Sequence, residues 1–366
     1  NTLEHLKNTY QSIKKYAPNV PMIIIDDASE DGTDIWLNSL DDKNLTVIIG
    51  KERKGHTYWY DEGMRRAKTP IVSILHSDMI IGPGYFENML KHLKPLSVVC
   101  ATRIEPPIHP AGLEKHVQHF GIDHNDFTWE AFENFVIDTA KKDKDITTKG
   151  IFAPWMLYKE DHLSIGGHDQ RFTPYGYEDS DIFNRWIQAG YEMIQSRDSL
   201  CYHMTCRGHR WNEGVGVENS DYKETMDRCR REFLRKWGEW IQNDKYQYPI
   251  IHPKYDKGLI VKNCNEQFIE MLEPWFDTLY VDCDYKNYIE KESKRTITDL
   301  FDRIKPYDNE KQNNILVSVD ASSFNQQDYI FLSQLAAIIQ DSGQIGDFEL
   351  GNLKINIIHM REYLIN

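Results

Sequence analysis

The chain has 366 residues, 40% of them apolar and 27% charged, and this length and balance predict a globular protein of two domains. Its formal net charge of −14 argues against nucleic-acid binding, because phosphate recognition requires a basic surface. Six scattered cysteines without a CxxC pair argue against a zinc site and favour reduced thiols in a cytoplasmic protein.

The first part of the chain alternates between predicted helices and short apolar runs. Apolar residues recur at helical spacing over residues 1–19, so a helix is predicted where an α/β domain normally has its first strand. Strands are predicted at 21–26, 46–50, 70–75 and 96–103, and helices at 56–68 and 82–94. The alternation predicts an α/β fold with a doubly wound, mostly parallel sheet whose first strand is missing.

The pattern changes after residue 103 and restarts after residue 249. Residues 104–149 are predicted as a long loop region with one or two helices over the active site. After this region we predict a strand at 150–158, a helix at 178–190, two short strands at 191–196 and 199–204, and a helix at 220–240. The predicted domains are therefore 1–245 and 246–366. The second is a smaller α/β domain without a phosphate-binding loop, and we expect it to bind a protein partner or mediate oligomerisation.

Two motifs place acidic residues at the ends of buried strands. In IIIDDASEDGT, Asp27 is interpreted as a contact to the base or ribose of a nucleotide, with capping of the next helix as the alternative. In ILHSDM, Asp78 ends a buried strand, where a carboxylate is costly unless it is paired or bound to metal. Oxygen ligands suit Mg²⁺ or Mn²⁺, so Asp78 is a candidate metal ligand, with a helix cap as the alternative.

Two further motifs lie in the segment from 165 to 204. Glu178 and Asp179 open a predicted helix, where a carboxylate can deprotonate an acceptor hydroxyl or can simply complement the helix dipole. His203 ends a predicted short strand, and a neutral imidazole there can complement Asp78 on a metal ion or serve a structural role.

Together these motifs resemble the inverting, family-two-like glycosyltransferases with the GT-A fold. The resemblance covers about residues 1–240 and is carried by DDASEDGT, by KGHTYWYDEGMRRAKTPIVSILHSDM and by GGHDQRFTPYGYEDSD. The last segment is also similar to that of galactosyl- and N-acetylgalactosaminyl-transferases. The resemblance implies metal-dependent transfer of a sugar, with inversion, from a nucleotide-diphosphate donor (a UDP-sugar is favoured) to a hydroxyl of a glycan or glycoconjugate.

The resemblance also implies residue roles. Asp179 corresponds to the catalytic base and Glu178 to its acceptor-holding neighbour, while Asp78 and His203 correspond to ligands of Mn²⁺ or Mg²⁺. The residues assigned to the donor are Asp26, Asp27, Lys54, Asp61, His76 and Ser77, and those assigned to the acceptor as stacking platforms are Trp155 and Tyr175. The chain departs from the family where HSD replaces the DxD motif, which leaves one carboxylate fewer.

Two alternative functions stay open from the sequence. A nucleotidyltransferase that makes nucleotide sugars shares the fold and an acidic metal site, but its glycine-rich basic signature is not found. A non-catalytic carbohydrate-binding or assembly protein is the other, although the retained Asp78, Glu178 and Asp179 argue against it. No apolar run reaches the length of a membrane span, so peripheral association through a lipid-linked acceptor is the membrane contact left open.

Overall fold

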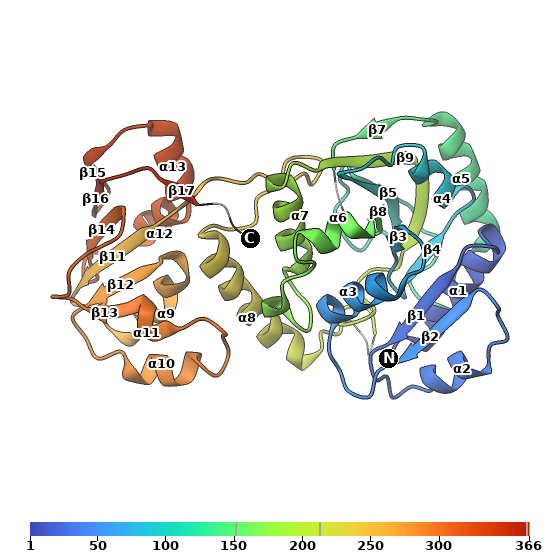
Figure 1. Cartoon of the computed structure of the whole chain (residues 1–366), viewed down its shortest axis with the longest axis horizontal. Coiled ribbons are helices and arrows are strands. Elements are labelled where there is room, and N and C mark those ends of the chain that lie inside the picture. The colour runs from blue at the N-terminus through green and yellow to red at the C-terminus, as the bar shows by residue number, and fades with distance from the viewer. Residues whose placement is uncertain (151, 212–213, 364, 366) are drawn as a thin grey trace. The chain divides into compact units, whose positions relative to one another are not determined.

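The computed structural model describes residues 1–150, 152–211, 214–363 and 365, and it divides into two compact units. Unit 1 comprises Asn1–Thr225 with Asn243–Pro249, and unit 2 comprises Met226–Gln242 with Ile250–Asn366 (Figure 1). Helix α8, Ser220–Trp237, therefore contributes residues to both units. The predicted boundary between residues 245 and 246 placed the whole helix in the first domain.

Unit 1 contains the elements of the motif-bearing region. Its helices are α1 (Leu3–Tyr16), α2 (Thr33–Ser39), α3 (His56–Arg66), α4 (Tyr85–Leu90), α5 (Trp129–Lys142), α6 (Lys159–Ser164), the 3₁₀ helix η1 (Gln170–Phe172) and α7 (Glu178–Gln188). Its strands are β1 (Met22–Asp26), β2 (Leu45–Ile49), β3 (Ile71–Ile74), β4 (Met79–Ile81), β5 (Ser97–Glu105), β6 (Lys115–Val117), β7 (Thr147–Thr148), β8 (Trp155–Tyr158) and β9 (Glu192–His203).

The strands of unit 1 form two sheets. β1 and β2 pair in parallel, and the other strands form a seven-stranded sheet with the order β3-β8-β5-β9-β4, extended by β6 on β5 and β7 on β9. β5 is parallel to β9 and β6, whereas β8, β4 and β7 are antiparallel to their partners. The predicted α/β class is confirmed, and the larger sheet is mixed.

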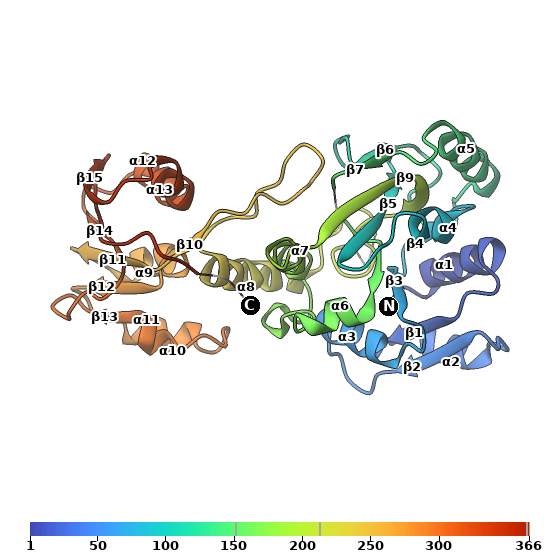
Figure 2. The ribbon, with the colours of Figure 1, turned by 45° about the horizontal axis from the view of Figure 1, so that its top comes forward.

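The central strands bury both of their faces. On β5, Val98 and Cys100 pack with α3 and α7, whereas Val99 and Ala101 pack with α1 and α4. Figures 1 and 2 show α7 and α1 on opposite sides of these strands. The continuous apolar runs that predicted strands arise because neither face meets water.

One strand replaces two predicted ones. The segments 191–196 and 199–204 form the single strand β9, and its pairing with β5 shifts register between Ala101 and Thr102. The polar residues between the two segments suggested a turn, but Asp198 and Ser199 are buried. Asp198 accepts a hydrogen bond from Ser196, and Ser199 donates one to the carbonyl of Tyr85.

Unit 2 is a second α/β unit around one core. Its sheet has the order β13-β12-β11-β14-β16-β15, in which the first four strands are parallel and the last two are antiparallel to their neighbours. Beyond α8, its elements are β10 (Lys254–Tyr255), β11 (Lys257–Lys262), α9 (Glu266–Leu272), η2 (Glu273–Trp275), β12 (Thr278–Val281), α10 (Lys286–Glu292), α11 (Leu300–Arg303), β13 (Ile304–Pro306), β14 (Ile315–Asp320), α12 (Gln326–Ser333), α13 (Leu335–Ser342), β15 (Gly346–Leu350), β16 (Leu353–Ile357) and β17 (Glu362–Tyr363). Within the described ranges, no helix has both the length and the apolar character needed to cross a bilayer.

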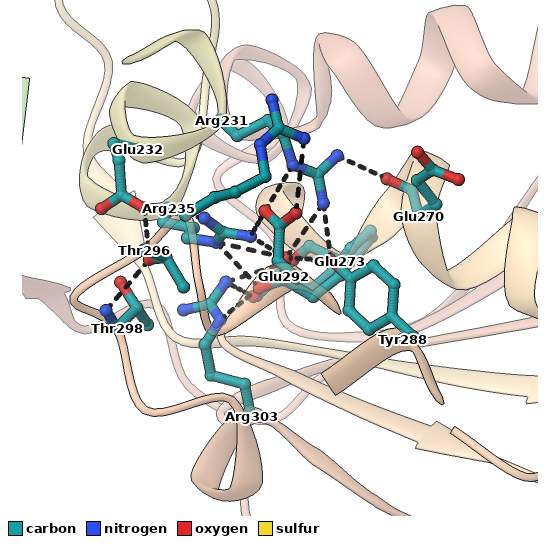
Figure 3. Close-up of polar contacts among 12 residues, drawn as sticks. Arg231, Glu232, Arg235, Glu270, Glu273, Tyr288, Glu292, Thr296, Thr298 and Arg303 are labelled. Atoms are coloured by element: carbon teal, nitrogen blue, oxygen red, sulfur yellow. Dashed lines mark hydrogen bonds and ion pairs between the residues drawn. The ribbon is translucent and has the colours of Figure 1, made fainter. Parts of the chain in front are cut away.

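A buried ion network fastens α8 to the rest of unit 2 (Figure 3). Glu273 is fully buried and accepts hydrogen bonds from Arg235, at 2.6 Å, from Arg303, at 2.7 Å, and from the Tyr288 hydroxyl, at 2.8 Å. Burial alone would raise the pKa of Glu273, but Arg303 and Arg235 lower it to about 2. Further ion pairs join Arg231 to Glu292 and Arg235 to Glu232.

Removing the central charge of this network is expected to destabilise unit 2. Glu273→Gln keeps the side-chain shape but leaves buried guanidinium groups without their anion, so the free energy of unfolding should fall by about 3–5 kcal/mol. Glu266→Gln is the matched control, because Glu266 pairs with Lys291 at the surface, where solvent screens the pair and its loss should change stability little. Urea unfolding of the whole chain would measure both; equal losses for the two variants would contradict the prediction.

Candidate active site

Asp78 lies in the segment that joins β3 to β4, and its carboxylate is 6% exposed. Because β4 pairs with β9 in the register Met79 to His203, the strand end brings His203 beside it. The Nε2 atom of His203 lies 3.7 Å from Asp78 Oδ2, and the Arg207 backbone N–H donates to the same oxygen at 3.3 Å. Burial would raise the pKa of Asp78, but His203 and His76 hold it below its usual value.

The Glu105 carboxylate fixes the orientation of the His203 ring. Its Nδ1 lies 3.2 Å from Glu105 Oε1, and Glu105 in turn accepts hydrogen bonds from Arg103, at 2.8 Å, and Lys115, at 2.7 Å. Burial would raise the pKa of Glu105, but these partners lower it far below its usual value. A histidine whose Nδ1 is held by a carboxylate presents Nε2 as the ligand atom, as in many metal sites.

His76 completes a group suited to a metal ion. His76, Asp78 and His203 each offer one ligand atom, and these atoms lie within 4.8 Å of one another. Burial lowers the pKa of His76 to about 3, so its imidazole is neutral at neutral pH. Its Nε2 is buried and has no hydrogen-bond partner in the described part of the chain. A neutral nitrogen without a partner beside an ionised carboxylate fits a divalent cation.

Glu178 and Asp179 begin α7 after a sharp turn. Gly176 and Tyr177 both have left-handed φ angles, 99° and 69°, which direct the chain into the helix. Burial and the neighbouring Glu178 raise the pKa of Asp179 to about 7. For Glu178, burial acts in the same direction, but His56 holds its pKa below the usual value. Two adjacent carboxyls whose pKa values are pushed apart are typical of an acid–base site.

Buried hydrogen bonds around Asp61 position the start of α7. Asp61, on α3, is 2% exposed and accepts hydrogen bonds from His162 Nε2, at 2.9 Å, and from His168 Nδ1 and N, at 2.7 and 2.9 Å. Gly167 lies so close that a Cβ atom there would be 2.2 Å from Asp61. Arg185, on α7, donates to the carbonyl of Gly167. We therefore correct the predicted donor-pocket role of Asp61, because its oxygens already hold this turn.

His56 and Tyr60, on α3, connect the carboxylate pair with the metal group. The His56 Nδ1 atom is 3.9 Å from Glu178 Oε1, and the His56 and His76 rings stack with centroids 6.1 Å apart. The Tyr60 ring stacks on His76 at the same separation. Two motifs about one hundred residues apart in the sequence thus belong to one site.

The other predicted donor residues organise the loops beside this site. Asp27 accepts hydrogen bonds from the backbone of Lys54, at 2.7 Å, and of Gly55, at 2.9 Å, while Asp26 accepts from the backbone of Ser29. The Lys54 ammonium lies over the Tyr58 ring, 4.7 Å from its centroid. Their contacts to a donor stay predictions, as do those of Ser77, whose hydroxyl bonds to that of Thr2 at 2.9 Å.

The two predicted acceptor residues have different surroundings. Tyr175 lies at the site, with its ring centroid 4.9 Å from His209 and 6.3 Å from His56. Trp155 is 1% exposed and packs edge-on against Trp186 in the core, so its predicted stacking role is wrong. An aromatic residue in a strand buried on both faces has no surface left for a sugar.

Sequence reasoning missed the residues that support the motif residues. Glu105 is one of them, and its position at the end of a strand was the available signal. His56 and His168 are others, and both adjoin glycines that permit close packing, Gly55 and Gly167. His76 was assigned to the donor, whereas its geometry places it among the possible metal ligands.

The two halves of the site fall within matches to known families. Residues 1–158 match the model described as glycosyl transferase family 2, and this range contains His76 and Asp78. Residues 138–207 match the model described as the N-terminal domain of galactosyltransferase, and this range contains Glu178, Asp179 and His203. The N-terminal part of the chain is therefore similar to family 2 glycosyltransferases.

A curated protein is distantly similar to the chain. The uncharacterized glycosyltransferase YfnE of Bacillus subtilis (strain 168) is 25% identical over 246 residues, which are 56% of this chain and 62% of YfnE. The chain thus spans less than two thirds of the length of this relative.

Two solved structures are also similar to the chain. The mannosyltransferase PcManGT from Pyrobaculum calidifontis, in complex with GDP-Man and Mn²⁺, is 18% identical with a TM-score of 0.40, over 57% of this chain and 55% of that one. GalNAc-T7, with UDP, GalNAc and Mn²⁺, is 13% identical with a TM-score of 0.45, over 80% of this chain and 51% of that one.

Proposed function

We propose that the chain is an inverting glycosyltransferase that moves a sugar from a nucleotide-diphosphate donor, with a UDP-sugar favoured, to a hydroxyl of a glycan or glycoconjugate. One observation carries this proposal. His56 contacts both Glu178 and the ring of His76, which brings the carboxylate pair and the candidate metal group into a single site.

Each end of the site has a separate task in the proposed reaction. Asp179, with its pKa raised to about 7, accepts the proton of the attacking hydroxyl, and Glu178 holds the acceptor beside it. Attack on the face opposite the leaving group inverts the anomeric carbon. His76, Asp78 and His203 would hold Mn²⁺ or Mg²⁺, and the ion would supply positive charge for the departing diphosphate.

The two alternatives are separated by one set of assays. The purified chain is incubated with UDP-, GDP- and dTDP-sugars, with Mn²⁺ and with a chelator, and the released nucleoside diphosphate is measured. We expect slow donor hydrolysis that requires the metal, and faster release when an acceptor is added. Turnover of a sugar phosphate with a nucleoside triphosphate would instead identify a nucleotidyltransferase, and binding without turnover would identify a non-catalytic protein.

Unit 2 is assigned no chemistry in this proposal. Its parallel strands end without a glycine-rich phosphate loop. At the edge where β11 and β14 end, the Asn263 side chain bonds both oxygens of Asp320, at 3.0 and 2.9 Å. The role proposed for unit 2 remains binding of a protein partner or oligomerisation.

A further inference from the structure

The start of α3 is fixed to the loop that precedes the carboxylate pair. The His56 backbone N–H donates to the carbonyl of Pro174 at 2.8 Å, and the Thr57 and Thr173 hydroxyls bond at 2.7 Å. Gly55 has a φ of 82°, and a Cβ atom there would lie 2.3 Å from Pro174 Cα. The position of His56 relative to Glu178 is therefore set by backbone contacts.

His56 engages only one oxygen of Glu178. Its Nδ1 lies 3.9 Å from Oε1, and the Glu178 side chain is 9% exposed whereas that of His56 is 37% exposed. Glu178 Oε2 is buried and has no hydrogen-bond partner in the ranges that the structure describes. A buried carboxylate oxygen without a donor is costly, unless a ligand supplies one.

Aromatic rings lie around His56. The His56 ring lies 5.5 Å from Tyr60, 6.3 Å from Tyr175 and 6.1 Å from His209, measured between centroids. A pyranose offers an apolar C–H face to such rings and hydroxyl donors to a carboxylate, so this group of rings near Glu178 suits a sugar.

We infer that His56 is a positioning residue that holds Glu178 by Oε1, so that Oε2 accepts a hydrogen bond from a hydroxyl of a sugar acceptor. This inference rests on the proposed function and names both a new residue and the acceptor class. It assigns His56 to the acceptor half of the site, although its ring also touches His76. Loss of the contact between His56 and Glu178 should therefore raise the acceptor KM by a larger factor than the donor KM.

Two substitutions at position 56 separate the polar contact of Nδ1 with Glu178 from the packing of the ring. His56→Phe keeps the ring and removes the donor, whereas His56→Asn places Nδ2 near the position of Nδ1. Transfer from the active nucleotide sugar is measured with Mn²⁺ against the methyl β-glycosides of glucose, galactose and N-acetylglucosamine. His119→Asn, at an exposed histidine, is the control, and thermal melting confirms that each variant folds.

We expect His56→Phe to raise the KM for the accepted glycoside about 10-fold or more, and to change the donor KM by a smaller factor, because phenylalanine keeps a ring against His76. His56→Asn should recover most of this loss. Combined with Glu178→Gln, His56→Phe should add little, because both remove the same contact. An unchanged acceptor KM in His56→Phe, or a change confined to the donor KM, would overturn the positioning role.

The wild-type protein distinguishes the inference from the proposed function. Donor hydrolysis that no methyl glycoside accelerates would overturn the sugar-acceptor inference and leave the transferase proposal intact. A wild type that turns over none of the donors would overturn the transferase proposal, and the inference with it.

Discussion

Asp179→Asn abolishes most sugar transfer, with an expected loss of about 10²–10⁴-fold in kcat, because the amide cannot accept the proton of the attacking hydroxyl. Donor binding should be nearly unchanged, since the metal group lies on other elements of the site. The measurement is transfer at saturating donor and acceptor, with the donor KM determined in parallel. Normal transfer by Asp179→Asn would exclude this residue as the base.

The pH dependence gives an independent check on the same assignment. Burial and Glu178 raise the pKa of Asp179 to about 7, so a growing fraction of the base is ionised as the pH rises through 7. Wild-type kcat/KM should therefore increase about tenfold per pH unit below 7 and level off above it. The residual activity of Asp179→Asn should lack this rise.

Loss of activity in this variant should not reflect unfolding. The folded protein holds the Asp179 proton more tightly than the unfolded chain, so ionisation above pH 7 opposes folding. A neutral amide removes that cost, and the variant should melt no earlier than the wild type at pH 8. Asp138→Asn, at an exposed position on α5, provides the matched control for both rate and melting.

The sequence predicted the elements of the fold well where burial is uniform. The run at 96–103 became β5, whose residues are all buried, because a strand that is covered on both faces is largely apolar. The prediction of elements from the sequence was wrong where buried polar residues form hydrogen bonds. Asp198 and Ser199 resemble a turn in the sequence, but their hydrogen bonds keep them inside β9.

The sequence identified the ionisable residues of the candidate site but not the residues that orient them. Asp78 is recognisable because a carboxylate at the end of a buried strand is costly without a partner, and Asp179 because it stands in the motif GGHDQRFTPYGYEDSD. The orientation of His203 depends on Glu105, which lies 98 positions away in the sequence and reaches it only because β5 pairs with β9. The predicted role of Asp61 was wrong for the opposite reason. Its motif position suggested a donor pocket, but both of its carboxylate oxygens accept hydrogen bonds from buried neighbours.

Asp78→Ala is expected to remove metal-dependent nucleotide binding. Asp78 is the only carboxylate of the group formed with His76 and His203, so the variant would leave two imidazoles and no anionic ligand for a divalent cation. Loss of a supporting residue around a metal typically weakens affinity 10–100-fold, and loss of the charged ligand itself should exceed that range. Titration with UDP, with and without Mn²⁺, measures the metal-dependent part.

Glu105→Gln tests whether the group acts as a metal site or only as a buried ion pair. The amide cannot hold His203 Nδ1–H as a carboxylate does, so metal affinity should fall about 10–100-fold, a smaller loss than that of Asp78→Ala. Asp138→Ala should bind as the wild type does, because Asp138 is exposed on α5. Identical UDP titrations of wild type and Asp78→Ala, each with and without Mn²⁺, would show that the metal is held elsewhere or not at all. The graded order of the two losses is what separates a metal shell oriented by Glu105 from three residues that merely pack together.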